Sequence, residues 1–148
     1  MQSLTIKILK DAVFTEVSLA SAYAGAKSAD DSSDFSRVAT VSEDSELLKR
    51  FWNDACGEVA SRLKEFTVAA DMSDEGFQID LELSGSYDSA MTPSVESDLF
   101  SSVSSGVTAR WFRFTKPEIA TDWEDRSNEL LLRAYRKLCY RRRPTRRS

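Results

Sequence analysis

The chain has 148 residues, of which 41% are apolar and fifteen are aromatic, so it fits one domain with a real hydrophobic core. It contains no histidine, which excludes the most common general base and the most common zinc ligand. The longest apolar run is far below the roughly 20 residues that a membrane span requires. The N-terminus lacks the pattern of a signal peptide.

Charge is distributed unevenly along the chain. The last nineteen residues hold eight basic residues and no acidic one, whereas the first 129 hold 24 acids against 12 bases, a net charge of −12. An acidic body with a basic tail is built to contact something anionic or carbonyl-lined outside itself. The acidic balance of the body argues against a surface that coats nucleic acid.

A strand and a helix are predicted near the N-terminus. Residues 4–8 alternate apolar and polar side chains, which is typical of a short strand. The spacing becomes helical from Asp11, and Gly25 is expected to end this helix in a left-handed cap. A polar surface loop is expected over residues 27–41. The apolar stripe of the helix consists of Val13, Val17, Ala20 and Ala24.

A second helix is predicted from a capping-box spacing at Thr40 and Glu43, with Ser42 as an alternative cap. It is expected to run to about Phe66. Its apolar stripe has a strong 3.6-residue period and comprises Leu47, Leu48, Phe51, Trp52, Ala55, Val59, Leu63 and Phe66.

Residues 77–83 alternate strictly and predict a strand with one buried face. This strand could pair with the N-terminal strand, but the sequence does not fix its partner. Residues 85–91 are expected to form a turn or loop.

Two further helices are predicted in the C-terminal half. Thr92 and Pro93 indicate the start of the first, with the Thr92 hydroxyl as the cap. Its small residues over 101–106 permit close approach of another backbone, so we expect this helix to be packed centrally. The last helix is expected from about Pro117 to about Arg142, nearly 40 Å long at about 1.5 Å per residue, with its C-terminal end projecting from the body.

The predicted fold is therefore mainly α. About four helices form a small helical body with a short β-hairpin or strand pair, and a long C-terminal helix ends in an extended basic arm. Residues 1–140 are assigned to a single body that includes the polar loop over 27–41, and residues 141–148 to the basic arm.

No catalytic residue, metal site or cofactor is predicted, and the protein is not expected to be an enzyme. The acidic group Asp30, Asp31 and Asp34 lacks the glycine and the distal glutamate of a calcium loop. The two cysteines, Cys56 and Cys139, have no CxxC spacing and are expected to be reduced thiols.

The densest aromatic cluster allows two interpretations. Trp111, Phe112 and Phe114 are interleaved with Arg110 and Arg113, and aromatic rings beside arginines can stack nucleic-acid bases. The simpler interpretation is a helix end that closes the core, with rings packed inward and arginines lying outward along them.

The basic arm is the leading candidate for a binding site. Arginine forks suit carboxylates and carbonyl-rich helix ends as well as phosphates, and Pro144 stops the helix so that the residues after it can extend along a partner. We expect the arm to insert into a protein partner. Phosphate binding, together with Arg110 and Arg113, is one alternative, and a solubilising basic tail without a binding function is the other. The candidate partner-binding residues are Tyr140, Arg141, Arg142, Arg143, Pro144, Arg146 and Arg147.

The order of elements over residues 42–148 resembles the head-to-tail connector proteins of tailed bacteriophages, also called adaptor or head-completion proteins. The helix that opens Ser42-Glu-Asp-Ser-Glu-Leu-Leu-Lys-Arg-Phe-Trp-Asn-Asp-Ala55 is similar to their first long helix, and residues 99–114 are similar to the helix that closes their core. The basic C-terminal arm also fits this family. The first forty residues and the strand at 77–83 do not belong to that pattern.

The resemblance implies a structural subunit of the virion neck, assembled in the host bacterial cytoplasm. Such subunits form a ring, usually of twelve copies, beneath the portal protein, with the C-terminal segment reaching into the portal's outer rim. The implied partners are other copies of the chain, the portal protein and the next neck or tail protein. DNA would pass through the lumen without specific binding, and no membrane is involved.

Overall fold

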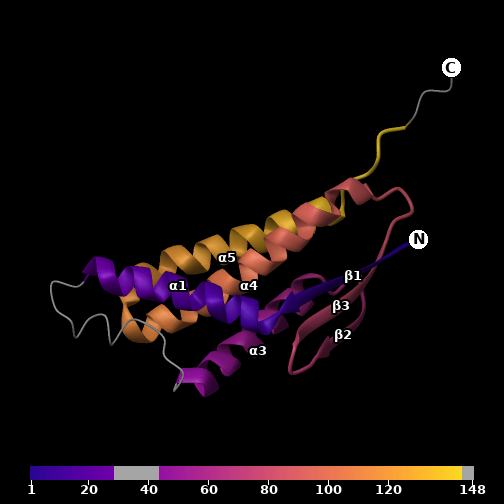
Figure 1. Cartoon of the computed structure of the whole chain (residues 1–148). Coiled ribbons are helices and arrows are strands. Elements are labelled where there is room, and N and C mark those ends of the chain that lie inside the picture. The colour runs from indigo at the N-terminus through magenta and orange to yellow at the C-terminus, as the bar shows by residue number, and fades with distance from the viewer. Residues whose placement is uncertain (29–43, 145–148) are drawn as a thin grey trace.

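The computed structural model describes residues 1–28 and 44–144. The described chain is mainly helical with a small antiparallel sheet, which confirms the predicted fold class. Figure 1 shows the elements, whose bounds are β1 Gln2–Leu9, α1 Lys10–Ser28, α3 Ser45–Arg62, β2 Thr67–Met72, β3 Gly76–Leu83, the 3₁₀ turn η2 Ser89–Met91, α4 Thr92–Thr115 and α5 Pro117–Leu138.

The sheet has the strand order β1-β3-β2, and both pairs are antiparallel. The predicted strand at 77–83 is β3, and its partner is indeed the N-terminal strand, with Ile6 opposite Ile79. The third strand, β2, was not predicted. Helix α3 ends at Arg62 rather than near Phe66 as predicted. A turn over residues 63–66 then leads into β2.

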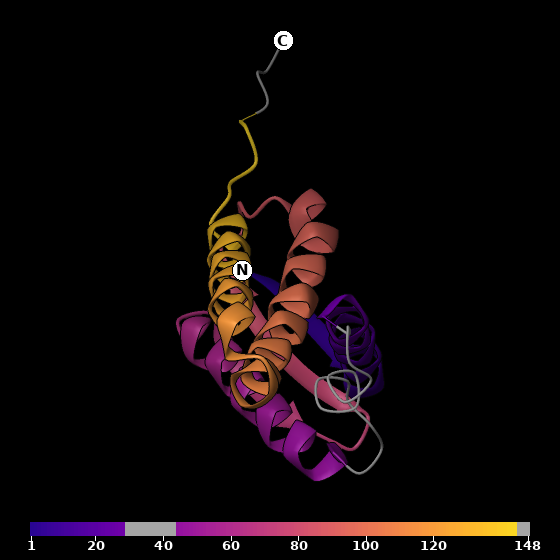
Figure 2. The same ribbon diagram turned by 90° about the vertical axis from the view of Figure 1, so that its left-hand side faces the viewer.

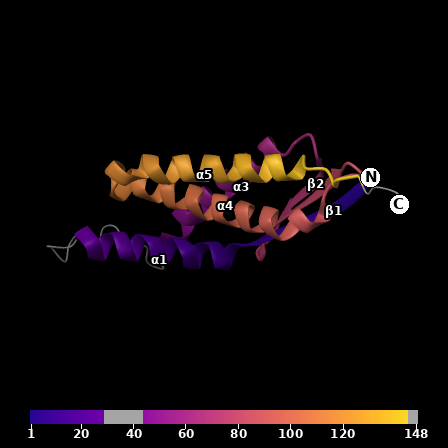
Figure 3. The ribbon, with the colours of Figure 1, turned by 90° about the horizontal axis from the view of Figure 1, so that it is seen from above.

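Helix α4 lies between α1 and α5, as Figure 3 shows from above. Helix α3 lies on another side of α4, and α4 and α5 run antiparallel as a long hairpin (Figure 2). The inner residues of β1 and β3 complete the core, including Ile6 and Ile79, which are at most 1% exposed. The central position predicted for α4 is confirmed.

Small residues allow α4 and α5 to approach closely. The Ser102 hydroxyl donates to the Ser127 carbonyl at 2.8 Å, and the Ser127 hydroxyl donates to the Ser102 carbonyl at 2.7 Å. Gly106 lies one turn further along α4, where an added Cβ would come within 3.1 Å of the Ser127 hydroxyl. Because both serines satisfy their hydroxyls in this reciprocal contact, the interface stays polar without an unpaired group.

Two predicted helix boundaries in the N-terminal half are wrong or lie outside the described residues. Helix α1 continues through Gly25 to Ser28, because a glycine inside a helix costs only about 1 kcal/mol and does not by itself end it. The first two residues of the predicted loop at 27–41 are therefore helical. The rest of that loop, the capping residues Thr40, Ser42 and Glu43, and Asp30, Asp31 and Asp34 lie outside the described residues.

Two predicted boundaries in the C-terminal half are also wrong. Thr92 is the first residue of α4 rather than its cap, and its hydroxyl lies 3.1 Å from the Tyr87 hydroxyl instead. Helix α5 ends at Leu138, four residues before the expected Arg142, and it does not project. Leu138 is fully buried, so α5 packs along α4 to its last turn and only the residues after it leave the body.

Candidate docking site at the C-terminal arm

The base of the basic arm is bonded to a distant turn. The Arg142 amide donates to the Ser86 carbonyl at 2.7 Å, and the Asp88 amide donates to the Tyr140 carbonyl at 3.2 Å. Between them, Arg141 and Tyr87 form an antiparallel β-bridge. Residues 140–142 are thus held by main-chain bonds to residues 86–88.

That turn is itself fixed from two sides. The Tyr87 side chain is 2% exposed, and its hydroxyl lies 3.1 Å from that of Thr92 at the start of α4. The Gln2 amide group donates to the Tyr87 carbonyl at 2.9 Å and to the Gly85 carbonyl at 3.0 Å. The arm therefore leaves the body from a junction of β1, α4 and α5.

The side chains of the arm point into solvent. Tyr140 is 49% exposed, and Arg141, Arg142, Arg143 and Pro144 are all exposed. Among the described residues, none of these three guanidinium groups has an acidic partner; Arg141 donates to the Cys139 carbonyl at 2.9 Å, and Arg142 lies 3.5 Å from the Gly85 carbonyl. Figure 1 shows residues 141–144 leading away from the helices. Arg146 and Arg147 lie outside the described residues.

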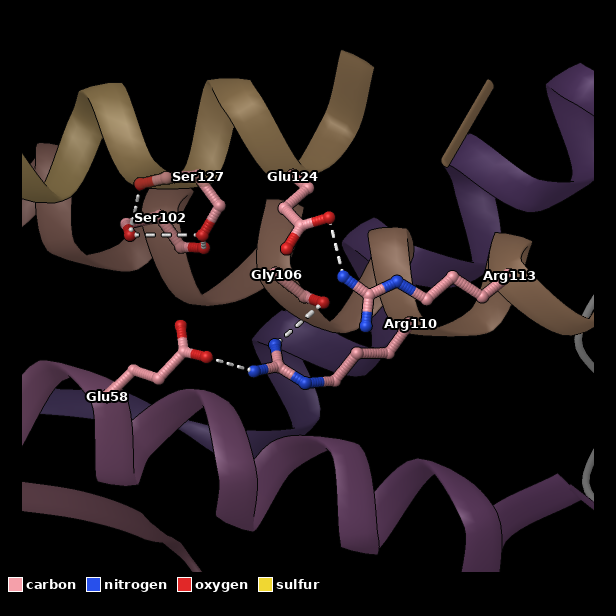
Figure 4. A network of polar contacts seen from close by, with 7 residues as sticks. All are labelled: Glu58, Ser102, Gly106, Arg110, Arg113, Glu124 and Ser127. Carbon is pink, nitrogen blue, oxygen red and sulfur yellow. Dashed lines mark hydrogen bonds and ion pairs between the residues drawn. The ribbon is translucent and has the colours of Figure 1, made fainter. Parts of the chain in front are cut away.

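Arg110 and Arg113 are occupied by acidic side chains, as Figure 4 shows. Arg110 contacts Glu58 at 2.6 Å and donates to the Gly106 carbonyl at 3.0 Å. Arg113 contacts Glu124 at 2.5 Å, and the hydrogen bond to Glu124 raises the pKa of Arg113 above its ordinary value. Both arginines therefore hold α3, α4 and α5 together.

The aromatic cluster matches the core-closing interpretation in two of its three rings. Trp111 and Phe112 are buried at 5% and 0% exposure. Phe114 is 71% exposed and stacks on Phe51 with ring centroids 5.9 Å apart.

The aromatic cluster lies far from the arm. It closes the C-terminal end of α4, whereas the arm begins beside the N-terminal end of that helix, about 35 Å away along its 24 residues. The structure thus does not bring Arg110 and Arg113 together with Arg141, Arg142 and Arg143.

The cleft beside Arg110 has a volume of about 80 Å³, and its charged lining residues are Glu58, Arg110, Arg113 and Glu124, which are already paired. No cluster of potential metal ligands occurs among residues 1–28 and 44–144. Cys56 is buried and its pKa is raised by that burial to about 12, so its thiol is a poor nucleophile.

None of the described helices is long and apolar enough to cross a bilayer.

The residues that anchor the arm were missed by the sequence analysis. Residues 86–88 carry no motif, and their bond partners lie more than fifty residues further along the chain. The one local signal is a tyrosine in a serine-rich turn, because a large aromatic side chain rarely stands in a solvated loop without packing. Comparison with known protein families, with characterised proteins and with solved structures gives no match for this chain.

Proposed function

We propose that this protein is a structural subunit that docks onto a larger assembly through its basic arm. The observation that carries the proposal is the contrast between the base and the side chains of the arm. The main chain of residues 140–142 is fixed to the body, while the guanidinium groups of Arg141, Arg142 and Arg143 have no acidic partner among the described residues. A fixed base lowers the entropy lost on docking.

The chemistry of the arm selects its partner. Guanidinium groups bind carboxylates and carbonyl-rich helix ends with two parallel hydrogen bonds. Residues 1–129 carry a net charge of −12, so the body would be repelled by a strongly acidic surface that the arm contacts. The best partner is therefore a protein with a local acidic or carbonyl-lined recess rather than a uniformly acidic polymer.

The specific proposal is a subunit of a ring in the neck of a tailed phage, joining the portal protein to the next neck or tail protein. The resemblance to connector proteins supports this assignment, as do the helical body and the arm at its C-terminus. In a ring, several arms engage one assembly at once, so weak individual contacts add to a strong attachment. No step of this role requires a catalytic residue, and we propose none.

A charge-removal variant tests docking without disturbing the fold. Replacing Arg141, Arg142, Arg143, Arg146 and Arg147 by glutamine keeps the main-chain bonds of residues 140–142. Cosedimentation with portal-bearing heads should then weaken by at least about tenfold, because the charge-assisted contacts are lost. Unchanged cosedimentation of this variant would contradict the proposal.

A matched control removes the same charge from the body. Five exposed basic residues of the body are replaced by glutamine in this control, and cosedimentation should stay at the wild-type level. The residues are Lys49, Arg50, Arg62, Lys64 and Arg126.

Nucleic-acid binding by the arm is the second candidate, because the same three guanidinium groups also fit phosphates. Five arginine–phosphate contacts on duplex DNA give a log–log salt dependence with a slope of about −4.5. A titration that shows this slope, with no binding to portal-bearing heads, would replace the docking proposal with this one.

A further inference from the structure

Strand β2 contributes little to the core of the protein. Its first residue, Thr67, is half-buried, and the next five residues are all exposed. Four of those five are apolar, and Val68 and Met72 are 66% and 45% exposed. A strand at the edge of a sheet with apolar residues exposed on both faces is a site where another strand pairs.

The outward-facing backbone groups of β2 can be identified. The Ser73 amide donates to the Gly76 carbonyl, and hydrogen-bonded and non-hydrogen-bonded pairs alternate along an antiparallel ladder. Asp71 and Ala69 therefore bond to β3, whereas Ala70 and Met72 direct their N–H and C=O groups away from it. These outward groups have no backbone partner among the described residues.

The opposite edge of the sheet is open in the same way. The Lys10 amide donates to the Glu75 carbonyl, so the same alternation turns the backbone groups of Leu9, Lys7 and Thr5 outward from β1. No backbone partner for them occurs in the part of the chain that the structure describes. Each copy thus has two sheet edges without a backbone partner among residues 1–28 and 44–144.

The two edges carry opposite charges at the same level of the sheet. Lys7 on β1 and Asp71 on β2 both lie opposite Gln78 of β3. Both strands run antiparallel to β3 and hence parallel to each other. A second copy shifted sideways along the sheet would place its Lys7 beside Asp71 of the first.

We propose that β2 of one copy pairs in parallel with β1 of a second copy, and that this contact joins the subunits of the ring. The inference rests on the proposed function for the ring itself and deepens it by naming the surface between subunits. The β2 edge is occupied by the β1 edge of another copy.

The hydrogen-bond pattern of the two edges fits this register. In a parallel ladder, a residue whose backbone groups face the neighbouring strand bonds to the two residues on either side of the residue opposite it. Lys7 of the second copy would accordingly bond to Ala70 and Met72, the two residues of β2 whose groups face outward. Asp71 and Lys7 of the second copy would share one face, where opposite charges on neighbouring strands attract.

The apolar residues fit as well. Ala70 and Met72 lie on the same face of the sheet as Ile79 and Phe77, which the helices cover. In the proposed register they would lie next to Ile6 and Ile8 of the second copy. Because the contact joins two different edges, it is heterologous and can be repeated from copy to copy until a ring closes.

One test removes an outward donor without touching the β2–β3 ladder. The Ala70 amide faces outward, so the variant Ala70→Pro should keep its fold, as measured by circular dichroism, and lose self-association at millimolar concentration. Ala70→Ser keeps the amide and should assemble like the wild type. Sedimentation velocity measures both, and assembly of a folded Ala70→Pro protein at the wild-type level would overturn the proposal.

A charge exchange tests the choice of partner edge. Lys7→Glu and Asp71→Lys are both exposed substitutions, and each should raise the dissociation constant between copies by roughly 2- to 30-fold. The double variant should restore it. Loss on Asp71→Lys with no effect of Lys7→Glu would overturn the β1 edge in favour of two β2 strands meeting in a dimer.

The outcomes separate this inference from the proposed function. Multimers that form equally well in all these variants would overturn the edge contact and leave the ring in place. A wild-type protein that is monomeric at every concentration, both alone and on portal-bearing heads, would overturn both.

Discussion

Lys137, near the end of α5, contacts Asp98 of α4 at 2.6 Å, and the two side chains are only 20% and 13% exposed. The same ammonium group donates to the Ser94 hydroxyl at 2.6 Å. This pair joins the last turn of α5 to the first turns of α4, directly before the arm. It therefore stabilises both the helical hairpin and the base from which the arm leaves.

Removing this ammonium group should destabilise the fold. Lys137→Met leaves the Asp98 carboxylate partly buried without its partner, and we expect the free energy of unfolding to fall by about 2 kcal/mol. Urea denaturation measures this loss. Lys137→Arg keeps the charge and should lose less than half as much; equal stability of Lys137→Met and the wild type would contradict the structural role of the pair.

Gly57 of α3 and Gly106 of α4 should respond differently to replacement by alanine. An added Cβ at Gly57 meets no atom within 4 Å, so Gly57→Ala should raise the free energy of unfolding by about 0.5–1 kcal/mol. At Gly106 the same Cβ would come within 3.1 Å of both Arg110 and Ser127. Gly106→Ala should therefore gain nothing or lose stability, and a gain equal to that of Gly57→Ala would show that α4 and α5 are not closely packed there.

The two cysteines should differ in reactivity. Cys139 is exposed and Cys56 is buried, so a thiol reagent at mildly alkaline pH should label one site per folded chain and two in denaturant. Cys139→Ser should abolish labelling of the folded protein. Rapid labelling of Cys56 in the folded state would contradict the packing of α3 against the core.

Burial of Cys56 should also make stability depend on alkaline pH. The folded-state pKa of Cys56 is raised to about 12 from an ordinary value of 9.0, so the unfolded chain loses the proton first. The stabilising effect is present below pH 9 and is lost as the pH rises toward 12. Between pH 8 and pH 10, the wild type should lose about 1.4 kcal/mol more than a Cys56→Ala variant in urea denaturation.

Sequence patterns predicted the elements whose side chains form the core. The apolar stripe from Leu48 to Val59 and the alternation at 77–83 depend on burial of one face, which is a local and periodic signal. Strand β2 buries almost nothing, so it has no such period and escaped prediction. Its existence depends on bonds to β3, which are set by the register of the hairpin.

The positive charge of the arm could be predicted from the sequence, but the main-chain bonds that hold its base could not. The exposed side chains of Arg141, Arg142 and Arg143 follow from composition and from Pro144. The bonds of residues 140–142 to residues 86–88 join segments more than fifty residues apart, and only the packing of α5 along α4 brings them together. The ion pairs of Arg110 with Glu58 and of Arg113 with Glu124 depend in the same way on how the helices pack.

The docking role is tested most directly by electron microscopy of portal-bearing heads mixed with the purified protein. We expect a ring of density beneath the portal, with the segment after Leu138 entering the portal's rim, and no ring when the five arm arginines are replaced by glutamine. Heads without added density at saturating protein, or a ring that forms equally well with the arginine-free arm, would contradict it.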